Sequence, residues 1–148
     1  TAKFTIAGNT YSESFDVLID PKAADAGVTQ EELLAQEKLA LQVRDLLAEA
    51  SHLEDDIKQA VKALDGNKSG NARKKLMALQ ALQDQVTTSE GIYMKPMLVD
   101  QIRYLSFMLN RADQMPGKDA YDRYEELSDL LSKIKADYSG MVDINSKR

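Results

Sequence analysis

The stretch that decides the fold is Gln30–Leu64, with the sequence QEELLAQEKLALQVRDLLAEASHLEDDIKQAVKAL. Its apolar residues recur at alternating spacings of four and three, the heptad pattern that gives a helix an apolar seam. The seam residues are Leu39, Val43, Leu46, Ala50, Leu53, Ile57, Ala60 and Leu64. At ~1.5 Å per residue the pattern predicts a helix roughly 50 Å long. Because a lone helix cannot bury such a seam, the rest of the chain is expected to supply partner helices.

Residues on either side of this stretch mark its ends. Thr29 is an N-cap candidate, and Glu32 follows it at the spacing of a capping box. Gly66 is a suitable residue to end the helix, because glycine readily adopts the left-handed conformation found there. Residues 21–28 are expected to form a connector that begins at Pro21.

Three further helices are predicted downstream, over residues 72–86, over residues 97–114 and from a cap at Asp119 to about Gly140, with Asn71 capping the first of them. Short connections favour antiparallel neighbours, so the expected fold is mainly α, an antiparallel bundle of four helices whose first helix is long. Its core seam is predicted to contain Leu39, Val43, Leu46, Leu53, Ile57, Leu64, Leu127, Leu131 and Ile134. The third helix could run back alongside the second or continue in line with it, and we favour the first arrangement.

A β-hairpin is predicted in front of the bundle. Residues 3–7 and 10–19 alternate apolar and polar side chains, and Gly8-Asn9 between them is a turn signal. The predicted domains are thus a hairpin over residues 1–20 and a helical bundle over residues 21–148. A two-stranded hairpin is marginal alone. We therefore expect it either to pack on the bundle or to belong to a sheet whose other strands precede Thr1.

Composition restricts the possible functions. The chain has 148 residues, of which 43% are hydrophobic and 29% charged, and a net charge of -5. This charge argues against nucleic-acid binding, which needs a concentrated basic surface, and against attraction to anionic membranes. No apolar run approaches the ~20 residues that span a bilayer, so membrane insertion is not expected. The chain contains no cysteine, which excludes thiol catalysis and cysteine-ligated zinc.

Few residues suggest chemistry. Glu49 and His52 match the Glu-x-x-His spacing of dinuclear metal sites in helical bundles. Such a site needs a second motif, and His52 is the single histidine, so no metal, cofactor or catalytic residue is predicted. Tyr and Met residues near the third helix could be core residues or a partner surface. The candidate partner surface consists of Tyr93, Met94, Met97, Tyr104 and Met108.

The order of segments is similar to that of a known family. The hairpin sequences FTIAGNTY and FDVLIDP lead into a capped helix with LLAQ and LQVRDLL, followed later by residues 105–113, Pro116 and residues 121–133. This order resembles the C-terminal region of bacterial sortilin-type β-propeller proteins, which include BNR-repeat, glycosyl hydrolase-like proteins. In that family a propeller is followed by an immunoglobulin-like sandwich and then by a helical tail.

The resemblance implies that residues 1–20 end an upstream immunoglobulin-like sandwich. The chain would then be a non-catalytic C-terminal accessory or interaction module of a larger protein, periplasmic or secreted, with the upstream domains as its partners. None of the family's Asp-box repeats occurs here, so no catalytic residue is assigned. The alternative function is an independent helical bundle that self-assembles into a homo-oligomer or binds a partner.

Overall fold

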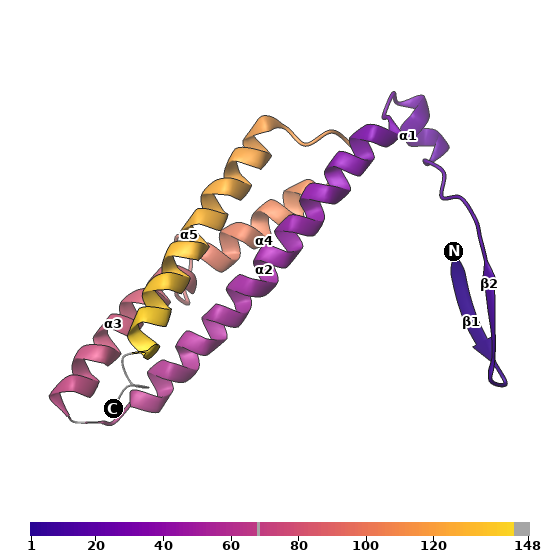
Figure 1. Ribbon diagram of the computed structural model, residues 1–148. Helices are drawn as coiled ribbons and strands as arrows, with labels where there is room; N and C mark the ends of the chain where they lie inside the picture. Colours follow the sequence, from indigo (N-terminus) through magenta and orange to yellow (C-terminus); the bar gives the residue numbers. More distant parts are fainter. Residues whose placement is uncertain (68, 144–148) are drawn as a thin grey trace.

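The computed structural model describes residues 1–67 and 69–143, and this part of the chain is mainly helical. An N-terminal antiparallel hairpin precedes the helices, and the four longer helices form an elongated bundle (Figure 1). Within these residues the elements are β1 (Ala2–Ile6), β2 (Asn9–Glu13), α1 (Pro21–Asp25), α2 (Gln30–Leu64), α3 (Gly70–Val86), α4 (Leu98–Leu109) and α5 (Lys118–Asp143).

Helix α2 is the element against which the other long helices pack. Its bounds are those predicted from the apolar pattern, and the predicted capping box is confirmed. The Glu32 N–H donates to Thr29 Oγ1 at 3.2 Å, and the Thr29 N–H donates to Glu32 Oε2 at 2.8 Å. The buried residues of α2 all belong to the seam: Leu39, Val43, Leu46, Ala50, Leu53 and Ile57.

Helices α3 and α4 follow one another along α2. Helix α3 packs beside the C-terminal half of α2, and α4 lies beside its N-terminal half (Figure 1). The Leu109 carbonyl at the end of α4 accepts a hydrogen bond from the Gln36 side chain, near the start of α2. The prediction that the third helix runs back alongside the second is therefore wrong, and the alternative in-line arrangement is found.

Helix length explains the in-line arrangement. The 35 residues of α2 extend over ~52 Å, whereas the 17 residues of α3 and the 12 of α4 extend over ~26 Å and ~18 Å. Neither shorter helix can cover the seam of α2 alone. Placed end to end, with buried Val86 and Leu98 on either side of the break, they cover most of it as one layer.

Helix α5 completes the core. It runs in the same direction as α2, with Lys135 paired to Glu49 and the Tyr138 hydroxyl 3.4 Å from the Asp56 carbonyl. Its buried residues Leu127, Leu131 and Ile134 join those of α2, α3 and α4 in one cluster. Leu64, at the last position of α2, is half-buried and lies outside that cluster.

The helix count and several helix ends differ from the prediction. The described residues contain five helices, because α1 forms in the expected connector. Asp20 caps α1 by accepting a hydrogen bond from the Lys22 N–H at 2.7 Å. Helix α3 is capped by Ser69 rather than Asn71. In α5, Asp119 lies in the first turn instead of at the cap, and Gly140 is tolerated inside the helix.

Helix α4 ends five residues earlier than predicted. At the end of α4 the Phe107 and Met108 carbonyl groups accept the N–H groups of Asn110 and Arg111, each at 3.3 Å and three residues ahead instead of the four of an α-helix. Side chains donate to other carbonyl groups nearby. The Asn110 Nδ2 donates to the Ser106 carbonyl at 2.7 Å, and the Gln36 Nε2 donates to the Ala112 carbonyl at 2.7 Å. These hydrogen bonds let the chain turn toward α5 after one short irregular segment.

The hairpin turn is displaced by one residue from its predicted position. Ile6 pairs with Asn9, so the two turn residues are Ala7 and Gly8 rather than Gly8 and Asn9. Their φ angles are 49° and 82°, and two consecutive positive values fit the turn that matches the twist of paired strands. Ala7 accepts a conformation that glycine would adopt more easily.

We predict that burial, and not the type of residue, sets the stability contribution of α2 leucines. Replacing Leu46, which is 7% exposed, by Ala should lower the free energy of unfolding by about 2–5 kcal/mol, because it leaves a cavity in the core. Leu34→Ala on the same helix is the matched control, since Leu34 is 56% exposed. Urea unfolding measures both changes. Equal losses for the two variants would show that the seam is misassigned.

Candidate functional site

The hairpin separates its side chains into an apolar and a polar face. Phe4 and Tyr11 are opposite each other in the register, and their rings stack with centroids 5.5 Å apart. Because strand side chains alternate between faces, Ile6 shares the face of this pair. Thr5 and Thr10 lie on the other face, with their hydroxyl oxygens 3.1 Å apart. We call the surface formed by Phe4, Ile6 and Tyr11 the apolar hairpin face.

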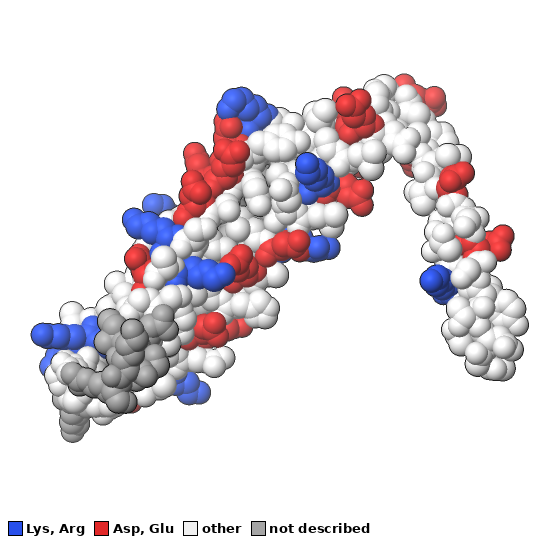
Figure 2. Space-filling model, viewed as in Figure 1, with Lys and Arg blue, Asp and Glu red and all other residues white. Residues whose placement is uncertain are grey.

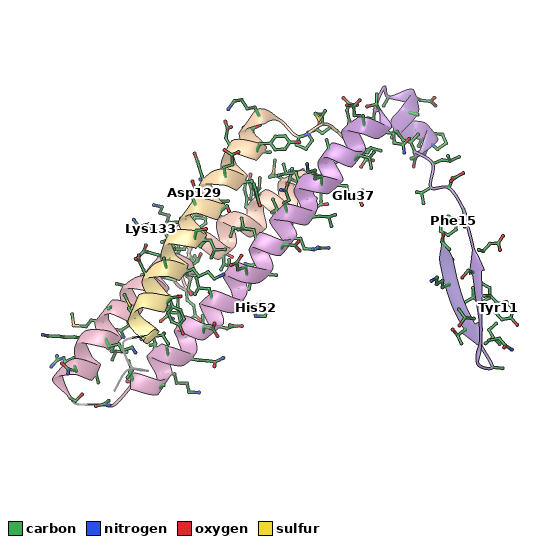
Figure 3. All side chains as sticks on the ribbon, in the orientation of Figure 1. Tyr11, Phe15, Glu37, His52, Asp129 and Lys133 are labelled. Carbon is green, nitrogen blue, oxygen red and sulfur yellow. The ribbon has the colours of Figure 1, made fainter. Side chains whose placement is uncertain are left out.

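The apolar hairpin face is uncovered. Phe4, Ile6 and Tyr11 are 50%, 61% and 50% exposed, and within the described residues neither strand contacts a helix. Figure 3 shows Tyr11 and Phe15 apart from the side chains of the bundle. An apolar hairpin face gains stability only when a further strand or helix covers it. This face is therefore a candidate docking surface.

The segment after the hairpin continues the apolar pattern without forming a strand. The second strand was predicted to reach Ile19, but β2 ends at Glu13. Glu13 already pairs with Ala2 at the start of β1, so no strand residue lies opposite residues 14–19. Phe15, Val17 and Leu18 are 58%, 80% and 83% exposed. A strand supplied from elsewhere could pair with this segment and lengthen β2.

A second candidate surface lies at the end of the bundle where α2 begins. A groove of about 480 Å³ opens between α4, the segment over residues 110–117 and the start of α5. We call it the α4–α5 groove. Apolar side chains form much of its wall, with several amide groups and one guanidinium beside them. Its lining includes Tyr104, Leu105, Met108, Leu109, Pro96, Pro116, Gln36, Gln101, Gln114, Asp119 and Arg123.

The side chain of Gln36 makes three hydrogen bonds on one side of this groove. Its Nε2 donates to the carbonyl groups of Leu109 and Ala112, and its Oε1 accepts from the Gln114 N–H at 3.3 Å. One side chain of α2 thus holds the end of α4 and the segment that follows it. No local sequence pattern indicates this role, because the bonded residues are more than seventy positions away.

Arg123 lies on the opposite side of the α4–α5 groove. Its guanidinium donates to Glu126 Oε2 and to Gln101 Oε1, each at 2.7 Å, and so links α5 to α4. A guanidinium fixed in this way can offer its remaining N–H groups to a carbonyl or carboxylate. The groove therefore combines apolar contact with oriented hydrogen-bonding groups, an arrangement typical of binding sites.

The predicted partner surface is split by the fold. Tyr104 and Met108 line the α4–α5 groove. Tyr93, which is fully exposed with a φ of 60°, and Met94 belong to the connection between α3 and α4 and are not among the groove residues. Met97 is the half-buried N-cap of α4, and its N–H donates to Thr88 Oγ1 at 2.9 Å.

The Glu-x-x-His pair lies on the surface of α2. Glu49 is paired with Lys135, and His52 is exposed (Figure 3). Among residues 1–67 and 69–143, no three His, Asp or Glu side chains gather in a way that could hold a metal ion. The described residues therefore offer no group of ligands around His52.

Two titratable groups near the ends of α5 have displaced pKa values. The Asp122 carboxylate accepts hydrogen bonds from Lys118 Nζ at 2.5 and 2.6 Å and raises the pKa of that amine. Burial raises the pKa of the Tyr138 phenol, and the negative charge of Asp56 raises it further. Lys118 forms its ion pair within α5, and Tyr138 connects α5 to α2. Both groups lie outside the two candidate surfaces.

Charges are mixed over the bundle. Figure 2 shows acidic and basic side chains interspersed on the visible face of the helices, whereas the tip of the hairpin carries none. The helices of the described residues include none with both the length and the apolar character needed to cross a membrane.

We predict that the hydrogen bonds of the Gln36 side chain beside the α4–α5 groove stabilise the fold. Gln36→Leu should lower the free energy of unfolding by about 1–3 kcal/mol, because it leaves the part-buried Leu109 carbonyl without its donor. Gln42→Leu is the matched control, since Gln42 is an exposed residue of the same helix. Thermal melting followed by circular dichroism measures both changes. A loss no larger than that of the control would contradict the assigned role.

Comparison of the chain with protein-family models, with curated proteins and with solved structures gives no match.

Proposed function

We propose that this chain is a non-catalytic helical accessory and interaction module of a larger protein, whose hairpin completes a sheet supplied from outside the bundle. The observation that carries the proposal is the apolar hairpin face, formed by stacked Phe4 and Tyr11 with Ile6 and left uncovered by the helices. A module of this kind acts by docking and positioning, so its surfaces matter more than any reacting group.

The energetics of the hairpin support docking. Full burial of a large apolar side chain contributes about 1.5–3 kcal/mol. Since Phe4, Ile6 and Tyr11 are each at least half exposed, a covering sheet would gain roughly half of that amount at each position. The outer edges of β1 and β2 also carry unpaired backbone groups, because the sheet has two strands. Such edges pair readily with an added strand.

The resemblance to sortilin-type β-propeller proteins suggests what supplies the sheet. There an immunoglobulin-like sandwich precedes the helical tail, and the hairpin would form its last strands. On this proposal the parent is a periplasmic or secreted glycosyl hydrolase-like protein, and the upstream domains are the principal partners. Residues 14–20, which are exposed except for half-buried Ile19, would then connect the sandwich to the bundle.

A second candidate function is an independent bundle that associates with itself or a partner. Exposed aromatic residues on α4 favour it, since Tyr104 is 64% and Phe107 59% exposed. The two functions use different surfaces and are compatible within one protein.

Cysteine labelling tests the principal proposal, because the chain has no cysteine of its own. Tyr11→Cys should react readily with a thiol reagent in the 148-residue chain. In a longer chain that includes the proposed sandwich, its reaction should be at least ~10-fold slower, because only opening of the sheet exposes it. Leu34→Cys, exposed on α2, is the control and should react equally in both chains. Equal labelling of Tyr11→Cys in the two chains would contradict docking of the hairpin.

A further inference from the structure

Helix α4 carries a second stripe on the side opposite its core residues. Leu98, Ile102, Leu105 and Leu109 face the bundle and are buried. On the other side, Asp100, Tyr104 and Phe107 of the helix and then Arg111 recur at spacings of four, three and four. That spacing is the heptad pattern of a helix seam. Two residues beyond the end of α4, the Arg111 N–H still donates to the Met108 carbonyl at 3.3 Å. We call these four residues the outer α4 stripe.

The centre of this stripe is apolar and uncovered. Tyr104 and Phe107 are 64% and 59% exposed, and Met108 beside them is 44% exposed. Leu41 of α2, 43% exposed, lies across a neighbouring hollow that it lines together with Ser106. Neighbouring exposed apolar side chains with charged residues beside them are typical of interaction surfaces. The outer α4 stripe is therefore a candidate interface.

The ends of the stripe carry opposite charges. Asp100 is at the start of α4, where it is paired with Arg103. The Arg111 guanidinium lies 5.5 Å from the centre of the Phe107 ring, and within the described residues no carboxylate forms an ion pair with it. In either direction along the stripe, a charged residue is followed by two aromatic residues and then by a residue of the opposite charge. It is complementary to itself when reversed.

We propose that a second copy of this chain packs its α4 antiparallel on the outer α4 stripe, about a two-fold axis between Tyr104 and Phe107. In that arrangement Tyr104 of each copy meets Phe107 of the other, as in antiparallel coiled coils. Asp100 of each copy meets Arg111 of the other. A parallel arrangement would place like charges together, so the charges select the antiparallel one.

The stripe is short, since α4 has 12 residues. It therefore gives a small interface, and small interfaces are typical of weak, reversible association. The proposal is independent of hairpin docking, because it uses no residue of β1 or β2. Either proposal can fail while the other holds.

A charge-reversal experiment on the full chain tests the pairing. Arg111→Asp alone places two carboxylates together at each end of the interface, and Asp100→Lys alone places two cations there. Each single variant should dimerise at least about tenfold more weakly than the native chain in sedimentation velocity at low salt. An equimolar mixture of the two should regain native-like dimerisation, because both ends of the mixed dimer then pair opposite charges.

The controls separate this interface from other contacts. Phe107→Ser removes an exposed ring and should also weaken the dimer, with an unchanged melting temperature. If either charge variant folds poorly, this variant still tests the interface. Association through the hairpin would be unaffected by all three substitutions. A native chain that stays monomeric at high concentration, a dimer indifferent to the substitutions, or a mixture that does not recover would overturn the proposal.

Discussion

The burial of the α2 seam is the constraint on which the rest of the structure depends. A 35-residue helix with apolar residues along most of its length cannot be covered by α3 or α4 alone, since these have 17 and 12 residues. The chain meets this constraint with α3 and α4 end to end as one layer and with α5 as the other. The resulting core has no buried polar or charged residue among the described positions.

The two candidate surfaces follow from this arrangement. Because α4 must lie beside the start of α2, its end meets Gln36, and the turn toward α5 forms the α4–α5 groove. Because α4 packs on α2 and α5 with one side only, its other side faces solvent with Tyr104 and Phe107. The hairpin has no place in the core, which is already complete, and its apolar face stays free.

The sequence predicts those features that depend on nearby residues. The bounds of α2, its capping box and the presence of a hairpin were all readable from periodicity and caps. Features that depend on distant residues were not. At the early end of α4 the Leu109 carbonyl accepts from distant Gln36, and the in-line path of α3 and α4 depends on comparing helix lengths. The turn at Ala7 was missed because alanine rarely adopts a positive φ.

On this proposal the bundle folds without the hairpin, and the hairpin serves an external partner. Removal of residues 1–20, followed by circular dichroism and thermal melting, tests it most directly. We expect the helical signal and a cooperative transition to remain, with a melting temperature close to that of the full chain, because no helix contacts either strand in the described structure. Loss of the helical signal or of cooperative melting would contradict the claim and make the hairpin an integral layer of the domain.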